Sequence, residues 1–185
     1  GVDLGVGELG ADKIVLNAPP HIVFAGRFAE QKNPLQIVRT LATLKDLPWE
    51  CVMIGDGPLF ASVQQEIEKE DLTERFALTG WVTPDEVLAW FSKSDILFMP
   101  SLSEGLPVVG VQALAMGLAL VVSDIGGFVD LVDDGENGFL VEDPETYAVH
   151  LRALLSSPNK LKDMRLASVS KSRFFALDFI VEKYE

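Results

Sequence analysis

The chain has 185 residues, of which 48% are hydrophobic and 23% are charged, so it is long enough for one domain with a substantial core and too apolar to be disordered. Its formal net charge of −13 argues against a nucleic-acid partner and against direct contact with an anionic membrane surface. A single cysteine, Cys51, excludes an internal disulfide and fits a reducing compartment, so we expect a cytoplasmic protein.

The first half of the chain alternates between short apolar runs and amphipathic stretches. Residues 1–18 contain several glycines and little periodicity, and we interpret them as an interdomain linker. Short apolar runs predict strands, while amphipathic stretches that open at or just after a proline predict helices. The predicted strands are 21–26, 49–55, 76–80 and 95–100, and the predicted helices are 33–46, 59–70 and 84–91.

The second half contains an uncharged run from Leu106 to Val122. Its length is at the short limit for a membrane span, and it contains glycines, a proline and a glutamine, so we predict a buried helix from Pro107 that runs into a strand. The predicted strands of this half are 118–123 and 138–142, and the remaining predicted helices are 145–155, about 159–171 and 177–185.

Strands of near-continuous Val, Ile, Leu and Phe, separated by helices, are typical of a parallel sheet that is buried on both faces. We therefore predict an α/β fold: a doubly wound, mostly parallel sheet of six strands with helices on both faces. The expected organisation is a Rossmann-like domain over residues 19–172, followed by a C-terminal helical segment over 173–185. Such folds bind ligands in the crevice beyond the carboxyl ends of the strands, so residues that directly follow a strand are candidate site residues.

Two cations, Arg27 and Lys32, lie between the end of the first predicted strand and the helix that starts near Asn33. A diphosphate needs charge-assisted donors, and here arginine would supply a planar fork and lysine a mobile point charge. The alternative interpretation, two solvated surface cations, stays open at this point.

An acid, Glu104, directly precedes the start of the uncharged helix at Gly105 and Pro107. The free N–H groups and the positive dipole end of a helix start favour an anion such as phosphate. The carboxylate either caps the helix or accepts hydrogen bonds from the vicinal hydroxyls of a sugar. No lysine or arginine occurs between Lys93 and Arg152, so any cation near Glu104 must come from elsewhere in the chain.

Three further groups of polar residues need an interpretation: a glutamine, a glycine-rich turn and the potential metal ligands. Gln112 in the uncharged run is either a structural amide or a group that recognises a ribose diol. The GDGP segment at 55–58 is interpreted as a turn that leads into the next helix. The two histidines, His21 and His150, lie far apart in the sequence and the acids of 130–136 lack the spacing of an EF-hand loop, so we expect no metal site.

In combination, GRFAEQKN (26–33) and SEGLPVVGVQALAMGLALVVSDIGGFVDLVDDGENGFLV (103–141) resemble the C-terminal, donor-binding half of the retaining GT-B glycosyltransferases of group 1. The match spans about residues 21–145. The resemblance implies transfer of a sugar, of the hexosyltransferase type, from a nucleoside diphosphate sugar with retention and without a metal or another cofactor. It also implies an N-terminal acceptor-binding domain as partner, toward which the C-terminal helix of residues 173–185 would return. This chain alone is therefore expected to be inactive.

The resemblance assigns roles to the residues around the helix start. Arg27 and Lys32 match the pair that grips the donor diphosphate, and Glu104 matches the first acid of the family's Glu-(seven residues)-Glu motif, which contacts the donor sugar. These three are the candidate catalytic residues. After Gly105, the backbone amides of Leu106 and Val108 match those that face the phosphates.

The resemblance also covers the nucleoside side of the site. Trp81 and Val82 match the segment whose main chain meets the base. Gln112 departs from the family, which usually has a second glutamate there that binds ribose, although an amide can still donate and accept hydrogen bonds. Two alternatives therefore stay open: a non-catalytic relative that binds a nucleotide or a protein, and a sugar-nucleotide epimerase of similar fold.

Overall fold

The computed structural model describes residues 14–105 and 107–184, with side chains up to residue 174. At its centre is a sheet whose six strands all run parallel, in the order β3-β2-β1-β4-β5-β6. The strands are β1 (His21–Ala25), β2 (Glu50–Ile54), β3 (Phe76–Gly80), β4 (Ile96–Met99), β5 (Ala119–Ser123) and β6 (Gly138–Val141). The predicted parallel α/β fold is confirmed.

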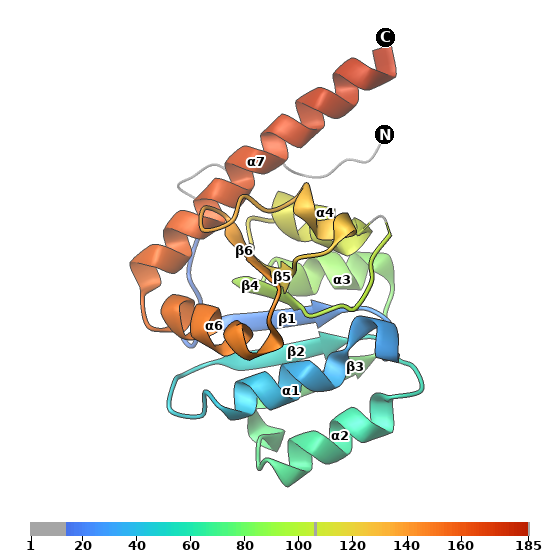
Figure 1. Cartoon of the computed structure of the whole chain (residues 1–185), viewed down its shortest axis with the longest axis vertical. Helices are drawn as coiled ribbons and strands as arrows, with labels where there is room; N and C mark the ends of the chain where they lie inside the picture. Colours follow the sequence, from blue (N-terminus) through green and yellow to red (C-terminus); the bar gives the residue numbers. More distant parts are fainter. Residues whose placement is uncertain (1–13, 106, 185) are drawn as a thin grey trace.

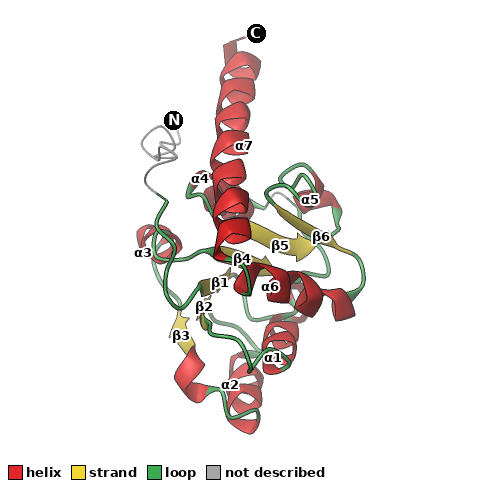
Figure 2. Cartoon of the chain, turned by 90° about the vertical axis from the view of Figure 1, so that its left-hand side faces the viewer, coloured by secondary structure: helices red, strands yellow, loops and turns green. Residues whose placement is uncertain are grey.

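Helices cover both faces of this sheet, as Figure 1 and Figure 2 show. On one face α1 packs against α2 and α6, while α3 and α4 lie on the other face and α4 packs against α7. The helices are α1 (Pro34–Ala42), α2 (Phe60–Lys69), α3 (Pro84–Phe91), α4 (Val108–Ala115), α5 (Gly126–Val129), α6 (Tyr147–Leu155) and α7 (Pro158–Tyr184). Single 3₁₀ turns are η3 (Glu30–Lys32), η4 (Thr73–Arg75) and η5 (Pro144–Thr146).

The strand order reverses between β1 and β4, which lie side by side at the centre of the sheet. From β1 the chain winds outward to β3 and then returns to form β4 on the other side of β1. The loops that follow these two strands therefore separate in opposite directions and open a crevice at the carboxyl edge of the sheet. The predicted site residues Arg27 and Lys32 lie on the first of these loops, and Glu104 and Gly105 lie on the second.

The uncharged run forms a helix followed by a buried strand, as predicted, but the helix is only partly buried, since Val108 in its first turn is 56% exposed. All five residues of β5 are buried, and so are Ala113, Leu114 and Ala115 on the last turn of α4. The helix begins at Val108, one residue later than predicted. Within the described part of the chain, no helix combines the length and the apolar character that crossing a membrane requires.

Some helix boundaries differ from the sequence predictions because turns or 3₁₀ segments occupy residues that were expected to be helical. α1 ends at Ala42 rather than near residue 46, where the hydroxyl of Thr43 donates to the carbonyl of Thr40 at 2.6 Å and the chain begins to turn. α2 begins at Phe60, so Pro58 lies in the preceding turn and not in the first turn of the helix.

The C-terminal segment forms one helix, α7, where two were predicted. The prediction was wrong because no glycine or proline interrupts residues 159–184, so nothing in the sequence ends the helix. The boundary predicted between residues 172 and 173 falls inside α7, which extends away from the sheet (Figure 1). Its return toward another domain stays a prediction.

Most of the predicted linker, residues 1–13, lies outside the described residues. The part that is described packs on the domain: Ile14 is buried, and the side chain of Asn17 donates to a carboxylate oxygen of Asp95 at 2.9 Å.

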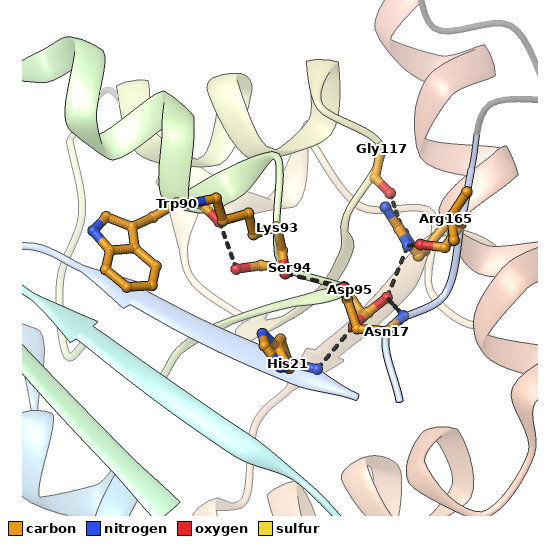
Figure 3. Close-up of polar contacts among 9 residues, drawn as sticks. Asn17, His21, Trp90, Lys93, Ser94, Asp95, Gly117 and Arg165 are labelled. Atoms are coloured by element: carbon orange, nitrogen blue, oxygen red, sulfur yellow. Dashed lines mark hydrogen bonds and ion pairs between the residues drawn. The ribbon is translucent and has the colours of Figure 1, made fainter. Parts of the chain in front are cut away.

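That carboxylate is the centre of a buried polar network at the amino edge of the sheet (Figure 3). Asp95 directly precedes β4 and is 0% exposed. Besides the side chain of Asn17, it accepts the backbone N–H of His21 at 2.8 Å and forms an ion pair with Arg165 of α7, also at 2.8 Å. The network thus ties the start of β1, the start of β4 and α7 together.

Two further N–H donors of the Arg165 guanidinium pair with backbone carbonyls. Its Nε donates to Gly117 at 2.7 Å, and Nη1 donates to Val15 at 3.0 Å. Burial lowers the pKa of Arg165, and the neighbouring Asp95 opposes that shift. Sequence analysis missed this network because its members are spread over the whole domain and show no local pattern.

Candidate functional site

The two predicted loops bring Lys32 and Glu104 into direct contact at the carboxyl edge of the sheet. Lys32 is the last residue of η3, and its Nζ lies 2.5 Å from Oε1 of Glu104, which follows β4. The side chain of Glu104 is only 6% exposed, whereas that of Lys32 is 22% exposed. The cation next to Glu104 therefore comes from a distant part of the chain, as the lack of lysine and arginine between Lys93 and Arg152 requires.

This ion pair borders a cavity of about 190 Å³. The cavity is lined by the ends of β1 and β4, by Phe128 of α5 and by the start of α4, from Pro107 to Gly110. As at any helix start, the first N–H groups of α4 have no acceptor within the helix, and among the described residues no side chain caps them. A lysine ammonium and unpaired amides thus face one cavity, an arrangement suited to an anion.

The loop that carries Arg27 and Lys32 is held by the turn that follows β2. The N–H of Phe28 donates to the carbonyl of Asp56 at 3.0 Å, close to two glycines with positive φ. A Cβ at Gly55 would lie 1.9 Å from the carbonyl oxygen of the residue before Arg27, and one at Gly57 would lie 2.7 Å from the carbonyl oxygen of Phe28. The GDGP segment is a turn, as predicted, and it also supports the cationic loop.

Arg27 is exposed and does not line the cavity. Within the described residues its side chain forms no hydrogen bond or ion pair. It lies on the same loop as Lys32, at the carboxyl end of β1. Its predicted contact with a diphosphate stays a prediction.

The loop that carries Glu104 is held from the opposite side by Gly127, which sequence analysis did not single out. A Cβ at Gly127 would lie 2.6 Å from the carbonyl oxygen of Gly105 and 2.9 Å from Cβ of Glu104. The first turn of α5 and the acidic loop therefore pack backbone against backbone. The Gly-Gly pair at 126–127 was the available signal, because paired glycines often mark a close approach of two chain segments.

Of the other predicted site residues that the structure describes, only Val108 lines the cavity. Trp81 follows β3 and is 75% exposed, and the neighbouring Val82 packs partly against the core. Gln112 lies half-buried on α4, and its side-chain amide has no hydrogen bond to any described residue. Gly105 is exposed, Val108 lines the cavity, and Leu106 lies outside the described residues. The roles assigned to these residues stay predictions.

Among the described residues, no three His, Cys, Asp or Glu side chains come together as a metal site would require. The chemistry that the described site offers is therefore cationic and hydrogen-bonding: one ammonium, the amides of a helix start and a buried carboxylate.

Comparison with known proteins assigns the chain to a family. The family model of glycosyl transferases group 1 matches residues 11–169. The D-inositol 3-phosphate glycosyltransferase of Paenarthrobacter aurescens (strain TC1) is 31% identical over 163 residues, which cover 83% of this chain and 40% of that protein. The 2-deoxystreptamine glucosyltransferase of Streptomyces kanamyceticus is 34% identical over 115 residues, which cover 61% of this chain and 30% of that protein.

Solved structures share the fold. The C-terminal domain of the group 1 glycosyl transferase LpcC from Francisella tularensis has a TM-score of 0.80 at 21% identity, and the match covers 94% of this chain and 97% of that one. The pneumococcal O-GlcNAc transferase GtfA, in complex with UDP and GlcNAc, has a TM-score of 0.78 at 21% identity, with 91% of this chain and 35% of that one covered. This chain spans less than half the length of the curated relatives named here. It belongs to the glycosyl transferases group 1 family.

Proposed function

We propose that this chain is the donor-binding half of a glycosyltransferase, and that it holds the diphosphate of a nucleoside diphosphate sugar at the carboxyl edge of its sheet. The observation that carries the proposal is the cavity in which Lys32, the start of α4 and Glu104 meet. Family membership supports it, as does the likeness in fold to GtfA, a transferase in complex with UDP and GlcNAc.

The ion pair explains how one site can serve both a diphosphate and a sugar. Without a ligand, Lys32 neutralises Glu104 at 2.5 Å. A bound diphosphate competes for the ammonium, and the carboxylate then becomes available to the hydroxyls of the attached sugar. The α4 amides would hold the phosphate oxygens at the same time.

In the proposed reaction the sugar leaves the diphosphate and is transferred with retention to an acceptor. Negative charge grows on the leaving diphosphate as the glycosidic bond breaks, and Lys32, Arg27 and the α4 amides stabilise it without a divalent metal. The leaving phosphate oxygens assist the acceptor hydroxyl on the same face of the sugar. The acceptor would bind to an N-terminal domain of the same protein, so this chain would bind a donor without transferring the sugar.

Titration calorimetry with UDP, GDP and ADP tests the proposal. We expect heat of binding with at least one of these nucleotides, and loss of that heat when Arg27 and Lys32 are both replaced by alanine. The absence of heat with all three nucleotides, or equal heat in the double variant, would contradict the proposed donor site.

Gln112 favours a second candidate function, a relative that binds a nucleotide but transfers nothing. Its amide stands where the family usually has a ribose-binding acid. Such a protein needs no contact with the sugar, so it would bind a nucleoside diphosphate and the corresponding nucleotide sugar equally well. A donor-binding domain would bind the nucleotide sugar more tightly, because Glu104 adds hydrogen bonds to the sugar.

A further inference from the structure

A chain of hydrogen bonds runs from α6 through the core to the carboxylate of Glu104. The phenol oxygen of Tyr147 lies 3.0 Å from Oγ of Ser123, and this Oγ donates to the carbonyl oxygen of Ser101 at 2.6 Å. The hydroxyl of Ser101 in turn donates to Oε1 of Glu104 at 2.8 Å. The same oxygen accepts the ammonium of Lys32, so the chain ends inside the candidate site.

All three hydroxyl-bearing residues are buried: Ser101 is 2% exposed, Ser123 6% and Tyr147 3%. Water therefore has little access to replace a lost hydroxyl. Since the proton of Ser123 is given to the carbonyl of Ser101, Tyr147 is the donor to Ser123. Burial raises the pKa of Tyr147, and its bond to Ser123 opposes that shift, so the phenol stays protonated and able to donate at neutral pH.

The far end of this chain is fixed to regular secondary structure. Ser123 is the last residue of β5 and pairs with Val141 of β6. Tyr147 is the first residue of α6, and its ring packs against Phe98 of β4 with centroids 5.2 Å apart. Strand and helix positions hold a site more rigidly than loops do.

The loop that carries Glu104, by contrast, has no regular structure of its own. Besides the contact with Gly127, the N–H of Leu102 donates to the carbonyl of Gln31 at 2.8 Å, and the side-chain amide of Gln31 donates to the carbonyl of Ser103. Both hydrogen bonds are made with Gln31, which belongs to the cationic loop. The loop follows β4 directly, and the hydrogen bond from Ser123 fastens it to β5 as well.

We propose that Ser123 and Tyr147 are positioning residues, which hold the Ser101–Glu104 loop so that the carboxylate faces the cavity. The proposal rests on the proposed function in one respect, the contact of Glu104 with the donor sugar. The held loop itself does not depend on any ligand, which allows the two ideas to fail separately.

The test compares Tyr147→Phe and Ser123→Ala with Ser94→Ala. The control removes a buried hydroxyl that donates to the carbonyl of Trp90 at 2.8 Å, at the opposite edge of the sheet (Figure 3). Calorimetry measures how much more tightly UDP-glucose binds than UDP, and hydrogen exchange measures protection of the 101–105 amides without ligand. We expect both test variants to lose about three- to tenfold of the sugar-dependent gain, as for one lost hydrogen bond, and to exchange these amides faster.

Thermal unfolding first establishes that each variant is folded. If one of the two test variants does not fold, the other still tests the same hydrogen-bond chain. If the parent binds UDP-glucose more tightly than UDP, the positioning role is contradicted when the folded test variants keep that gain, or when the control loses as much. If the parent shows no sugar-dependent gain, the proposed sugar contact fails and hydrogen exchange alone decides. Faster exchange of the 101–105 amides in both test variants, and not in the control, then supports the positioning role, and unchanged exchange overturns it.

Discussion

Replacing Lys32 by alanine is expected to weaken the binding of a nucleoside diphosphate by about ten- to 150-fold, since hydrogen bonds to charged groups contribute roughly 1.5–3 kcal/mol. Lys32 is the only cation that lines the cavity within the described residues. Its loss also leaves the buried carboxylate of Glu104 without a counterion and next to the incoming phosphate. Both effects act in the same direction, and calorimetry measures their sum.

Two further variants separate the site from the overall charge of the chain. Lys45→Ala removes a lysine that is also paired with a glutamate, Glu70 at 3.5 Å. Lys45 follows α1 and Glu70 follows α2, so this pair lies away from the carboxyl edge of the sheet. The Lys45 variant should leave nucleotide affinity unchanged. Glu104→Gln should strengthen binding of the nucleotide alone, because it frees Lys32 and removes a repelling charge. Equal losses of nucleotide affinity in the Lys32 and Lys45 variants would show that binding depends only on the net charge of the chain.

The second large effect concerns stability: Asp95→Asn is expected to lower the free energy of unfolding by about 3–5 kcal/mol, as removal of one partner from a buried ion pair does. The variant leaves the charge of Arg165 buried and unpaired. It also replaces one carboxylate oxygen by an NH₂ group, which cannot accept the hydrogen bonds that Asn17 and His21 donate in the parent. Urea unfolding followed by circular dichroism measures the change.

Its matched control is Asp46→Asn, which breaks an exposed ion pair of Asp46 with Arg152 at 2.8 and 3.1 Å. Solvent screening makes exposed pairs weak, so this variant should unfold close to the parent. A double variant, Asp95→Asn with Arg165→Met, should recover part of the loss, because no buried charge is then left unpaired. A drop no larger for Asp95→Asn than for Asp46→Asn would contradict the structural role of the buried network.

The sheet was predictable because its signals are local. Each buried strand is a short apolar run bounded by glycine, proline or charged residues, and the predicted bounds of 76–80 and 84–91 match β3 and α3. That Lys32 and Glu104 share one site followed from the rule that parallel strands end at one edge, together with the lack of any nearer cation. Their direct ion pair was not predicted.

The rest of the site was not predictable because it depends on contacts between distant single residues. Ser123 and Tyr147 are ordinary residues in their local sequence, and only the folded chain connects them to the Glu104 loop. The direction in which a loop side chain points is equally absent from the sequence. Arg27 thus follows β1 as expected and yet lies outside the cavity that Lys32 lines.

The most direct test of the account is an NMR titration that follows the backbone amides of this chain as UDP is added. We expect the largest chemical-shift changes at the carboxyl edge of the sheet, with little change around Asp95 at the opposite edge. The amides expected to shift most are those of Gly26, Lys32, Val109 and Gly110. Shifts centred on the amino edge, or no shifts at saturating nucleotide, would contradict the claim that a lysine and a helix start form an anion site in this fold.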